Sequence, residues 1–252
     1  MNPRWPLHRV ADLELSIVMP VFKEGEAVEP VLRRLTTTVS AAHEILVVYD
    51  FDDDPTVPVL ARLSAEFPAI RPLRNDLGRG VLNAMKAGIA AASAPYVMIS
   101  MSDGSDEAHV VDPMLARARE GADVVAASRY MRGGHQLGGP PIKRLMSRVA
   151  GLTLHWFAGV GTHDPTNNFK LYSRRFLDTV TIESTAGFEL ALELTVKASL
   201  AGLRIAEVPT TWRDRTAGES NFKLRKWLPH YLHWYRQAFV GRWLRRGSTL
   251  SR

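Results

Sequence analysis

The chain of 252 residues contains no cysteine. Disulfide bonds, zinc–thiolate sites and cysteine nucleophiles are therefore excluded. Any metal ion must be bound by oxygen atoms or by imidazole rings. The absence of cysteine also agrees with a reducing compartment.

Long apolar runs are missing as well. The best candidate, residues 149–161, is shorter than the roughly 20 residues that span a bilayer, and it is interrupted by His155. Residues 1–13 carry charged side chains and prolines in place of the apolar stretch of a signal peptide. We therefore expect a cytoplasmic protein without a transmembrane helix.

Acidic residues are absent from one end of the chain. Residues 222–252 contain eight of the 32 Lys and Arg residues and no Asp or Glu, which leaves 24 basic against 26 acidic residues elsewhere. The net charge of +6 therefore belongs to the tail, and the body is slightly acidic. This distribution disfavours a nucleic-acid-binding surface and indicates a basic anchoring or partner-binding segment.

Apolar, β-branched runs alternate with helical periodicity over the first half of the chain. Four runs are typical of buried parallel strands, at residues 14–21, 44–49, 96–101 and 123–128. Helical stripes lie between them, at residues 28–39, 59–67 and 81–92. This alternation predicts an α/β fold with a mostly parallel sheet flanked by helices. In such a sheet the loops at the carboxyl ends of the strands form the ligand crevice.

The second half of the chain is less regular. Residues 133–141 contain four glycines and two prolines, which predicts a mobile loop over the crevice. A second helical region follows, and then we expect a strand, a helix and a last strand, at residues 167–172, 189–201 and 204–208. We divide the chain into a catalytic domain, residues 1–221, and a basic, aromatic segment, residues 222–252.

The first crevice loop, Pro20–Glu24, lacks the G-x-G-x-x-G turn of dinucleotide-binding folds, which disfavours a dehydrogenase. Pro20 and Phe22 can form a wall beside a nucleobase, and Glu24 can accept hydrogen bonds from the base or the ribose. A cap of the following helix explains Glu24 equally well.

The second crevice loop is acidic, with Asp50 followed by Asp52, Asp53 and Asp54 before Pro55. Asp54 precedes a proline-initiated helix, so we expect it to cap that helix. Asp50 is the first residue past the strand and should point into the crevice. A carboxylate there can bind the ring N–H groups or ribose hydroxyls of a nucleotide.

The third crevice loop, Ser102–Glu107, carries Asp103 and Asp106 around Gly104. Carboxylates on a tight turn suit a hard cation such as Mg²⁺ or Mn²⁺, whose coordination is completed by water and phosphate oxygens. A helix-capping turn is the alternative. Two neighbouring acidic loops would repel a diphosphate unless a cation bridged the charges, and this favours the metal site.

Cationic side chains follow the fourth strand. Arg129 stands at its end, Arg132 comes next, and Lys143 and Arg144 lie beyond the glycine-rich stretch. These side chains can bind a donor diphosphate or a phosphorylated acceptor. Solvated surface charge is the alternative, and it suits Arg132 better than Arg129.

These loops together resemble the family 2 glycosyltransferases of the GT-A fold, most closely their dolichol-phosphate mannosyltransferase-like and polyprenyl-phosphate glycosyltransferase members. The resemblance covers about residues 14–240 and rests on six motifs in order, at Pro20–Glu24, Asp50–Thr56, Asp103–Asp106, Ala127–Tyr130, Asp164–Phe169 and Glu207–Ser220. Relatives have Asn where Lys23 stands and Lys where Asn221 stands. Asp103 and Asp106 are also one position further apart than the family's Asp-x-Asp, which makes Asp103 the preferred direct metal ligand and Asp106 a ligand through water.

The resemblance implies a reaction and the residues that serve it. It implies an inverting displacement in which a sugar leaves a nucleotide-diphosphate donor, with Asp103 and its cation stabilising the leaving diphosphate. Arg129 and Arg215 are implied to help with this charge. Arg215 and Ser220 are further implied to contact the phosphates of donor and acceptor.

The acceptor decides whether a general base is needed. A polyprenyl phosphate is already an anion and needs only alignment, whereas a saccharide hydroxyl needs a base, for which Asp164 and Glu189 are the candidates. An inactive subunit that binds nucleotide sugar or lipid phosphate is a further alternative. The altered spacing of Asp103 and Asp106 supports that alternative.

Residues 222–252 carry aromatic and basic side chains at helical spacing. This pattern is typical of a helix in the interface of an anionic membrane, and a helix packed on the catalytic core is the alternative. We expect a peripheral protein on the inner face of the membrane. We expect a nucleotide-sugar donor and a polyprenyl-phosphate or other lipid acceptor as its partners. A membrane-protein partner and a homo-oligomer are further alternatives.

Overall fold

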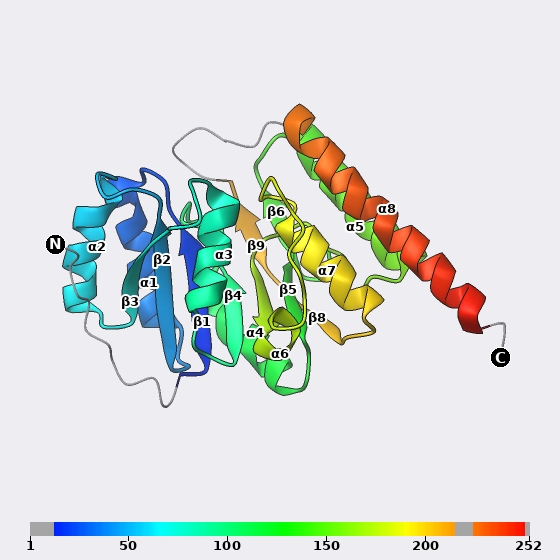
Figure 1. Cartoon of the computed structure of the whole chain (residues 1–252), viewed down its shortest axis with the longest axis horizontal. Helices are drawn as coiled ribbons and strands as arrows, with labels where there is room; N and C mark the ends of the chain where they lie inside the picture. The colour runs from blue at the N-terminus through cyan, green and yellow to red at the C-terminus, as the bar shows by residue number, and fades with distance from the viewer. Residues whose placement is uncertain (1–12, 215–223, 250–252) are drawn as a thin grey trace.

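The structure, a computed structural model, describes residues 13–214 and 224–249, and all structural statements concern those residues. Its centre is a seven-stranded sheet with the order β3-β2-β1-β4-β7-β5-β8 (Figure 1). The strands are β1 (Leu15–Pro20), β2 (His43–Tyr49), β3 (Ile70–Arg74), β4 (Tyr96–Ile99), β5 (Val124–Ser128), β7 (Lys170–Ser173) and β8 (Ile205–Pro209). The predicted α/β fold with a mostly parallel sheet is confirmed.

Six of these seven strands were predicted from the sequence, and two features were not. β7 runs antiparallel to both of its neighbours, β4 and β5, whereas the other strand pairs are parallel. The edge strand β3 was missed because its sequence, Ile-Arg-Pro-Leu-Arg, is short and contains a proline. Proline is tolerated at a sheet edge, where one side of the strand needs no hydrogen-bonding partner.

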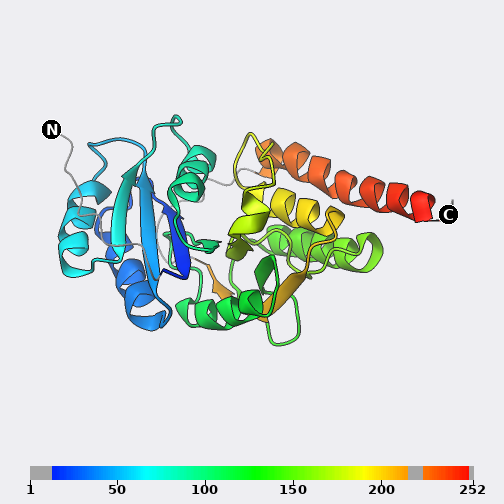
Figure 2. The ribbon, with the colours of Figure 1, turned by 60° about the horizontal axis from the view of Figure 1, so that its bottom comes forward.

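Helices cover both faces of the sheet (Figure 2). They are α1 (Glu29–Thr38), α2 (Thr56–Glu66), α3 (Val81–Ala91), α4 (Val111–Arg119), α6 (Arg174–Leu177) and α7 (Leu190–Leu200), with short 3-10 turns η1 (Gly25–Val28) and η2 (Ala108–Val110). Apolar residues of α1, α2 and α4 pack against one face, and those of α3 and α7 against the other. In β1, Ile17 and Val18 belong to opposite clusters, because successive side chains of a strand alternate between the faces.

A third apolar cluster joins two long helices beyond the sheet, α5 (Pro141–Ala158) and α8 (Leu224–Thr249), to α7 (Figure 1). Trp234 and Ala238 of α8 are buried there against Leu154 of α5 and Val196 of α7. The predicted C-terminal helix is therefore present, and part of its aromatic stripe packs on the core. No helix among the described residues is long and apolar enough to cross a bilayer.

The glycine-rich stretch after β5 is more ordered than its composition predicts. His135–Leu137 forms β6, which pairs in parallel with β9 (Thr211–Arg213) in a separate two-stranded sheet. The prediction of an irregular loop over 133–141 was therefore wrong for these three residues. The partner strand lies far along the sequence, so local composition carries no sign of the pairing.

Gly88 in α3 provides a test of how closely the helix layer approaches the sheet. A Cβ atom at this position would lie 2.3 Å from Val18 Cγ1 of β1, closer than side chains can pack. We expect Gly88→Ala to lower the free energy of unfolding by about 1–2 kcal/mol, although alanine favours a helix, because overpacking outweighs propensity. Combining it with Val18→Ala should cost less than the sum of the two single changes in urea unfolding, and a Gly88→Ala protein as stable as the parent would contradict the packing.

Candidate functional site

The loops singled out in the sequence leave the carboxyl ends of β1, β2 and β4, which are neighbours in the sheet. The loop after β1 turns sharply, with positive φ angles at Lys23 (57°) and Gly25 (54°). The backbone N–H of Lys23 donates to Asp54 Oδ2 (2.9 Å), and that of Gly25 donates to Thr56 Oγ1 (3.1 Å). The loops after β1 and β2 therefore form one wall of the crevice.

Asp54 is the buried carboxylate behind this wall. Its Oδ1 accepts a hydrogen bond from the Thr56 backbone N–H (2.8 Å) at the start of α2, although the N-cap residue of that helix is Pro55 and not the predicted Asp54. The same carboxylate holds Lys23 in a left-handed conformation that non-glycine residues adopt only at some cost. Asp54 thus fixes the shape of the site without facing it.

An aromatic and cationic hollow lies between these two loops and the loop before α3. Phe22 and Phe51 pack edge to face, with ring centroids 5.9 Å apart. The Arg79 guanidinium lies 4.8 Å from the Phe51 ring centroid. The hollow encloses about 440 Å³ and is lined by Phe22, Lys23, Phe51, Asp53, Pro55 and Arg79. Aromatic faces beside cations suit a flat ring that carries phosphate, and neither Phe51 nor Arg79 was among the predicted residues.

Asp50, predicted to contact the nucleotide, makes two hydrogen bonds within the protein. Its Oδ1 accepts from Asn75 Nδ2 (2.7 Å) and its Oδ2 from the Gly80 backbone N–H (2.9 Å). Asp50 therefore holds the loop between β3 and α3, which carries Arg79 into the aromatic hollow. This bracing role could not be predicted, and contact with a nucleotide stays a prediction.

The acidic loop after β4 is held in a compact turn. Asp103 Oδ1 accepts from the Ser105 backbone N–H (3.1 Å) and from Ser105 Oγ (2.6 Å), and Gly104 takes the positive φ angle of 71° that the turn requires. Ser102 Oγ donates to Glu24 Oε1 (3.1 Å). This hydrogen bond links Glu24, which we predicted to contact the nucleotide of the sugar donor, to the loop that we predicted to bind the metal ion.

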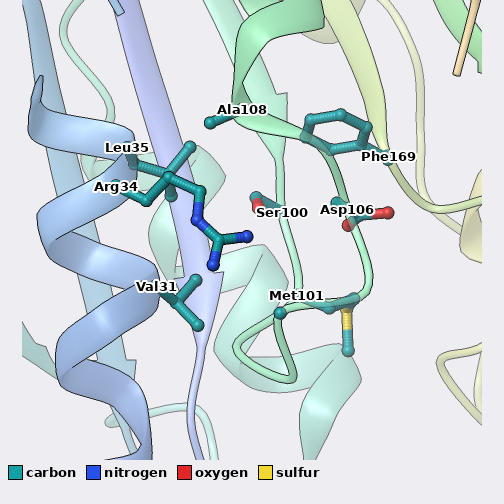
Figure 3. Close-up of a pocket in the computed structure, with 9 residues that line it drawn as sticks. Val31, Arg34, Leu35, Ser100, Met101, Asp106, Ala108 and Phe169 are labelled. Atoms are coloured by element: carbon teal, nitrogen blue, oxygen red, sulfur yellow. The ribbon is translucent and has the colours of Figure 1, made fainter. Parts of the chain in front are cut away.

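Asp106 differs from the other carboxylates because its Oδ2 is buried and has no hydrogen-bonding partner. Burial, followed by the nearby Asp103 carboxylate, raises the pKa of Asp106 to about 7. A small cavity of about 10 Å³ adjoins it, roughly the space of one water molecule. Figure 3 shows Arg34 reaching from α1 towards this cavity, with Asp106 beside Phe169 on the other side.

These features fit a divalent cation bound by Asp103 and Asp106. Within the described residues, no group of three or more His, Asp or Glu side chains is arranged to hold a metal ion. Mg²⁺ and Mn²⁺ sites in enzymes that handle phosphates commonly use one or two carboxylates, with water and substrate oxygens completing the shell. An unpartnered carboxylate oxygen beside a second carboxylate matches that requirement. Which of the two binds the metal directly stays a prediction.

Arg129 forms a buried ion pair with Asp164 at the end of β5. Its Nε donates to Asp164 Oδ2 (2.7 Å) and its Nη2 to Oδ1 (2.9 Å), while its backbone N–H also donates to Oδ2 (3.0 Å). Burial alone would raise the pKa of Asp164, but the Arg129 charge outweighs it and holds that pKa below its usual range. The Arg129 side chain keeps 11% of its surface exposed, so this permanent cation is presented from a fixed position.

Both predicted candidates for a general base are buried and accept hydrogen bonds within the protein. Asp164 is buried and ionised against Arg129, so it has little tendency to accept a proton near neutral pH. Glu189 is also buried, and its two oxygens accept from the backbone N–H groups of Ala186 (2.9 Å) and Gly187 (2.8 Å) at the start of α7. Both carboxylates hold loops together, and a role for either of them as a base stays a prediction.

Lys170 is a buried residue close to the ion pair, and we did not predict a role for it from the sequence. Its Nζ donates to the backbone carbonyl of Asp164 (2.9 Å) and to that of Asn167. Burial lowers the pKa of Lys170 to about 7. A lysine in an otherwise apolar strand is the signal that could have indicated this role, since a buried lysine needs acceptors close by.

The remaining predicted phosphate contacts lie on α5 or outside the described residues. Lys143 and Arg144 stand in the first turn of α5, and their contact with a phosphate stays a prediction. Arg215 and Ser220 lie outside the described residues. The strand before them, β9, contacts the acidic loop through the Thr211 N–H, which donates to Glu107 Oε2 (3.0 Å).

The chain is similar in sequence to several known proteins. The family described as Glycosyl transferase family 2 matches residues 16–181. An undecaprenyl-phosphate mannosyltransferase of Micrococcus luteus is 30% identical, over 82% of this chain and 87% of that protein. A polyprenol monophosphomannose synthase of Mycolicibacterium smegmatis is 26% identical, over 84% of this chain and 85% of that protein. A dolichol-phosphate mannosyltransferase of Pyrococcus furiosus is 24% identical, and the match covers only 63% of its length.

Solved structures show the fold. Glucosyl-3-phosphoglycerate synthase from Mycobacterium tuberculosis, in complex with Mn²⁺, uridine diphosphate and glucosyl-3-phosphoglycerate, superposes with a TM-score of 0.61 at 19% identity, over 96% of this chain and 84% of that one. The predicted GT-A fold is therefore confirmed. Because the family match covers most of the chain and includes the loops after β1, β2, β4 and β5, the chain belongs to the family 2 glycosyltransferases.

Proposed function

We propose that this protein transfers a hexose from a nucleotide-diphosphate sugar to a polyprenyl phosphate at the surface of a membrane. The observation that carries the proposal is the meeting of three features at one edge of the sheet. These are the aromatic hollow, the carboxylate pair with an unpartnered oxygen, and the fixed Arg129 cation. A nucleotide, a diphosphate bridged by metal and an acceptor phosphate each have a matching group.

The donor nucleotide is assigned to the hollow between the first two loops. Phe22 and Phe51 offer ring faces and edges, and Lys23 and Arg79 add positive charge beside them. Glu24 lies between this hollow and the metal loop through its bond with Ser102, a suitable place for an acceptor of ribose hydroxyl hydrogens.

Asp103 and Asp106 are the residues that would hold Mg²⁺ or Mn²⁺. A divalent cation at this position supplies neutralising charge to the diphosphate that leaves when the sugar departs. Arg129 adds a charge that needs no rearrangement during the reaction, because Asp164 already holds its guanidinium in place. We propose a single displacement with inversion at the anomeric carbon, as in the resemblance on which the assignment rests.

The state of the two candidate bases supports a phosphate acceptor. Asp164 and Glu189 are both engaged in internal hydrogen bonds, and neither is exposed to the crevice. A phosphate monoester is ionised at neutral pH and attacks without losing a proton, so it needs only alignment. The names of the bacterial and archaeal relatives include polyprenol, undecaprenyl and dolichol acceptors, in agreement with this acceptor class.

A lipid-linked acceptor also implies where the enzyme works. We propose a peripheral location on the inner face of the membrane, where cytoplasmic nucleotide sugars meet the lipid. The basic helix α8 supports this location through its lack of acidic residues. Part of its stripe is used for packing on α5 and α7, so the membrane contact cannot consist of the whole stripe.

Replacing Asp103 should abolish transfer and leave the fold intact. We expect Asp103→Ala to lower kcat/KM at least about a hundredfold, because the charge of the leaving diphosphate loses its metal. Asp178→Ala removes an exposed carboxylate far from the crevice and is the matched control. Unchanged turnover of the purified Asp103→Ala protein in a donor panel with Mn²⁺ would refute the metal assignment.

Asp106 should show opposite effects on stability and on activity. Asp106→Asn removes a charge whose buried Oδ2 has no hydrogen-bonding partner, so the metal-free protein should gain about 1–3 kcal/mol in unfolding free energy. The same change should weaken Mn²⁺ binding and lower transfer, because the new amide carries no negative charge. Thermal unfolding with and without Mn²⁺ measures the stability and the metal binding, and an activity assay measures transfer. A variant that Mn²⁺ stabilises as strongly as the parent would exclude Asp106 as a ligand.

Truncating Phe51 tests the donor pocket. Phe51→Ala removes one wall of the hollow and the ring beneath Arg79, so donor binding should weaken about tenfold with little change in kcat. Leu77→Ala, in the neighbouring loop, removes an exposed apolar side chain of similar size and should leave donor binding unchanged. Calorimetric titration with nucleoside diphosphates gives the affinity of each variant. Equal affinities for Phe51→Ala and the parent would contradict the assignment of the nucleotide to this hollow.

A further inference from the structure

The outer face of α5 exposes an unusual set of apolar side chains. They are Ile142, Leu145, Met146, Val149, Trp156 and Phe157, with 37% to 69% of each residue's surface accessible. Their spacing of one, three, four and seven residues places them along one side of the helix. An exposed apolar stripe of this length on a soluble surface normally marks a contact with a partner or a membrane.

The opposite side of α5 is firmly held by the protein. Leu154 and Ala158 are buried in the cluster with α7 and α8. Gly151 is packed so closely that a Cβ atom there would lie 2.1 Å from the backbone oxygen of His163. The exposed stripe therefore belongs to a helix fixed on the core, and it is not the result of loose packing.

Helix α8 lies beside α5 and carries exposed apolar side chains of its own. Tyr235 Oη donates to Thr153 Oγ1 (3.0 Å), and the Arg242 guanidinium lies next to Gly159, so the two helices run side by side in the same direction. Leu232, Val240, Trp243 and Leu244 of α8 are exposed, Trp243 at 75%. The α8 side chains that pack inward and those that remain exposed are therefore different residues.

The charges on these two helices have one sign. α5 carries Lys143, Arg144 and Arg148, and neither α5 nor α8 contains an acidic residue, although the chain has 26 of them. Apolar side chains flanked by cations, with tryptophans among them, match the interface of a bilayer that contains anionic lipid.

We propose that the apolar stripe of α5, extended by the exposed residues of α8, is the surface by which this protein docks on an anionic bilayer. The proposal rests on the proposed function in so far as the acceptor is a membrane lipid. It differs from the expectation for residues 222–252 because it assigns the main contact to α5, within the region assigned to the catalytic domain. Both helices lie flat on the surface, with tryptophans at headgroup depth and cations towards lipid phosphates.

The charge pattern also argues against a second copy of this chain as the occupant. In a two-fold dimer each surface meets its own copy, so the cations of α5 and α8 would face cations. Neither helix carries a carboxylate to pair with them. Like charges across an interface oppose association, whereas anionic headgroups complement this surface.

Flotation with phosphatidylcholine vesicles, with and without phosphatidylglycerol, tests the proposal on the full chain. The parent should bind the anionic vesicles, and Leu145→Asp combined with Trp156→Asp should weaken that binding at least about tenfold, because charges replace two inserting side chains. Leu77→Asp is the matched control, an exposed leucine on a distant loop, and should bind as the parent does. Circular dichroism and thermal unfolding confirm that the variants are folded. The milder pair Leu145→Ser and Trp156→Ser serves if the aspartates disturb the fold.

Four outcomes are decisive. Loss of vesicle binding in the stripe variants alone supports docking through α5. Equal binding of parent and stripe variants overturns the proposal, and so does a change from dimer to monomer in sedimentation without a change in vesicle binding. Because flotation needs no donor or acceptor, vesicle binding that depends on the stripe in a protein without transfer activity would refute the proposed function and leave the docking surface standing.

Discussion

The buried ion pair between Arg129 and Asp164 is the interaction on which the rest of the site depends. It ties the end of β5 to the loop between α5 and β7, and both oxygens of Asp164 are used by Arg129. Removing one partner of such a pair costs about 3–5 kcal/mol, because the other charge stays buried alone. Lys170 fixes the same loop from below through two backbone carbonyls. The cation that faces the crevice is therefore rigid because its counter-charge belongs to the scaffold.

Asp106 differs from the paired residues of the site because one of its oxygens has no partner within the protein. Asp50 and Asp54 satisfy their oxygens with internal donors, so they shape the crevice without needing a ligand. Asp106 keeps one buried oxygen unpartnered beside Asp103, an arrangement that destabilises the protein alone. Proteins tolerate such groups mainly where a ligand satisfies them. The metal-binding half of the site is thus recognised by a buried carboxylate oxygen that has no hydrogen-bonding partner. The arginine half is recognised by a cation whose counter-charge lies within the protein.

The sequence predicted the sheet and the position of the site because both depend on local patterns. Buried parallel strands produce continuous apolar runs, and the crevice loops follow them directly, so Asp50, Asp103 and Arg129 could be placed at one edge. Contacts between distant segments could not be predicted. The Asp164 carboxylate seemed available as a base because its partner lies 35 residues away, and β6 seemed irregular because its partner strand is remote. The exposed stripe of α5 was also invisible, since an amphipathic helix does not reveal which side meets the core.

The position of α5 relates the proposed membrane contact to the chemistry. One side of the helix presses on His163, the residue before Asp164, and the opposite side carries the exposed stripe. An α-helix with its side chains is about 10–12 Å across, so a bilayer on the outer side would lie about one helix diameter from the loop that holds Arg129. The phosphate of a polyprenyl lipid resides at headgroup depth. It would therefore need to rise only a short distance to meet the cation, while its apolar chain stayed in the membrane. A firmly packed helix suits this purpose better than a flexible anchor, because it fixes the height of the active site above the lipid.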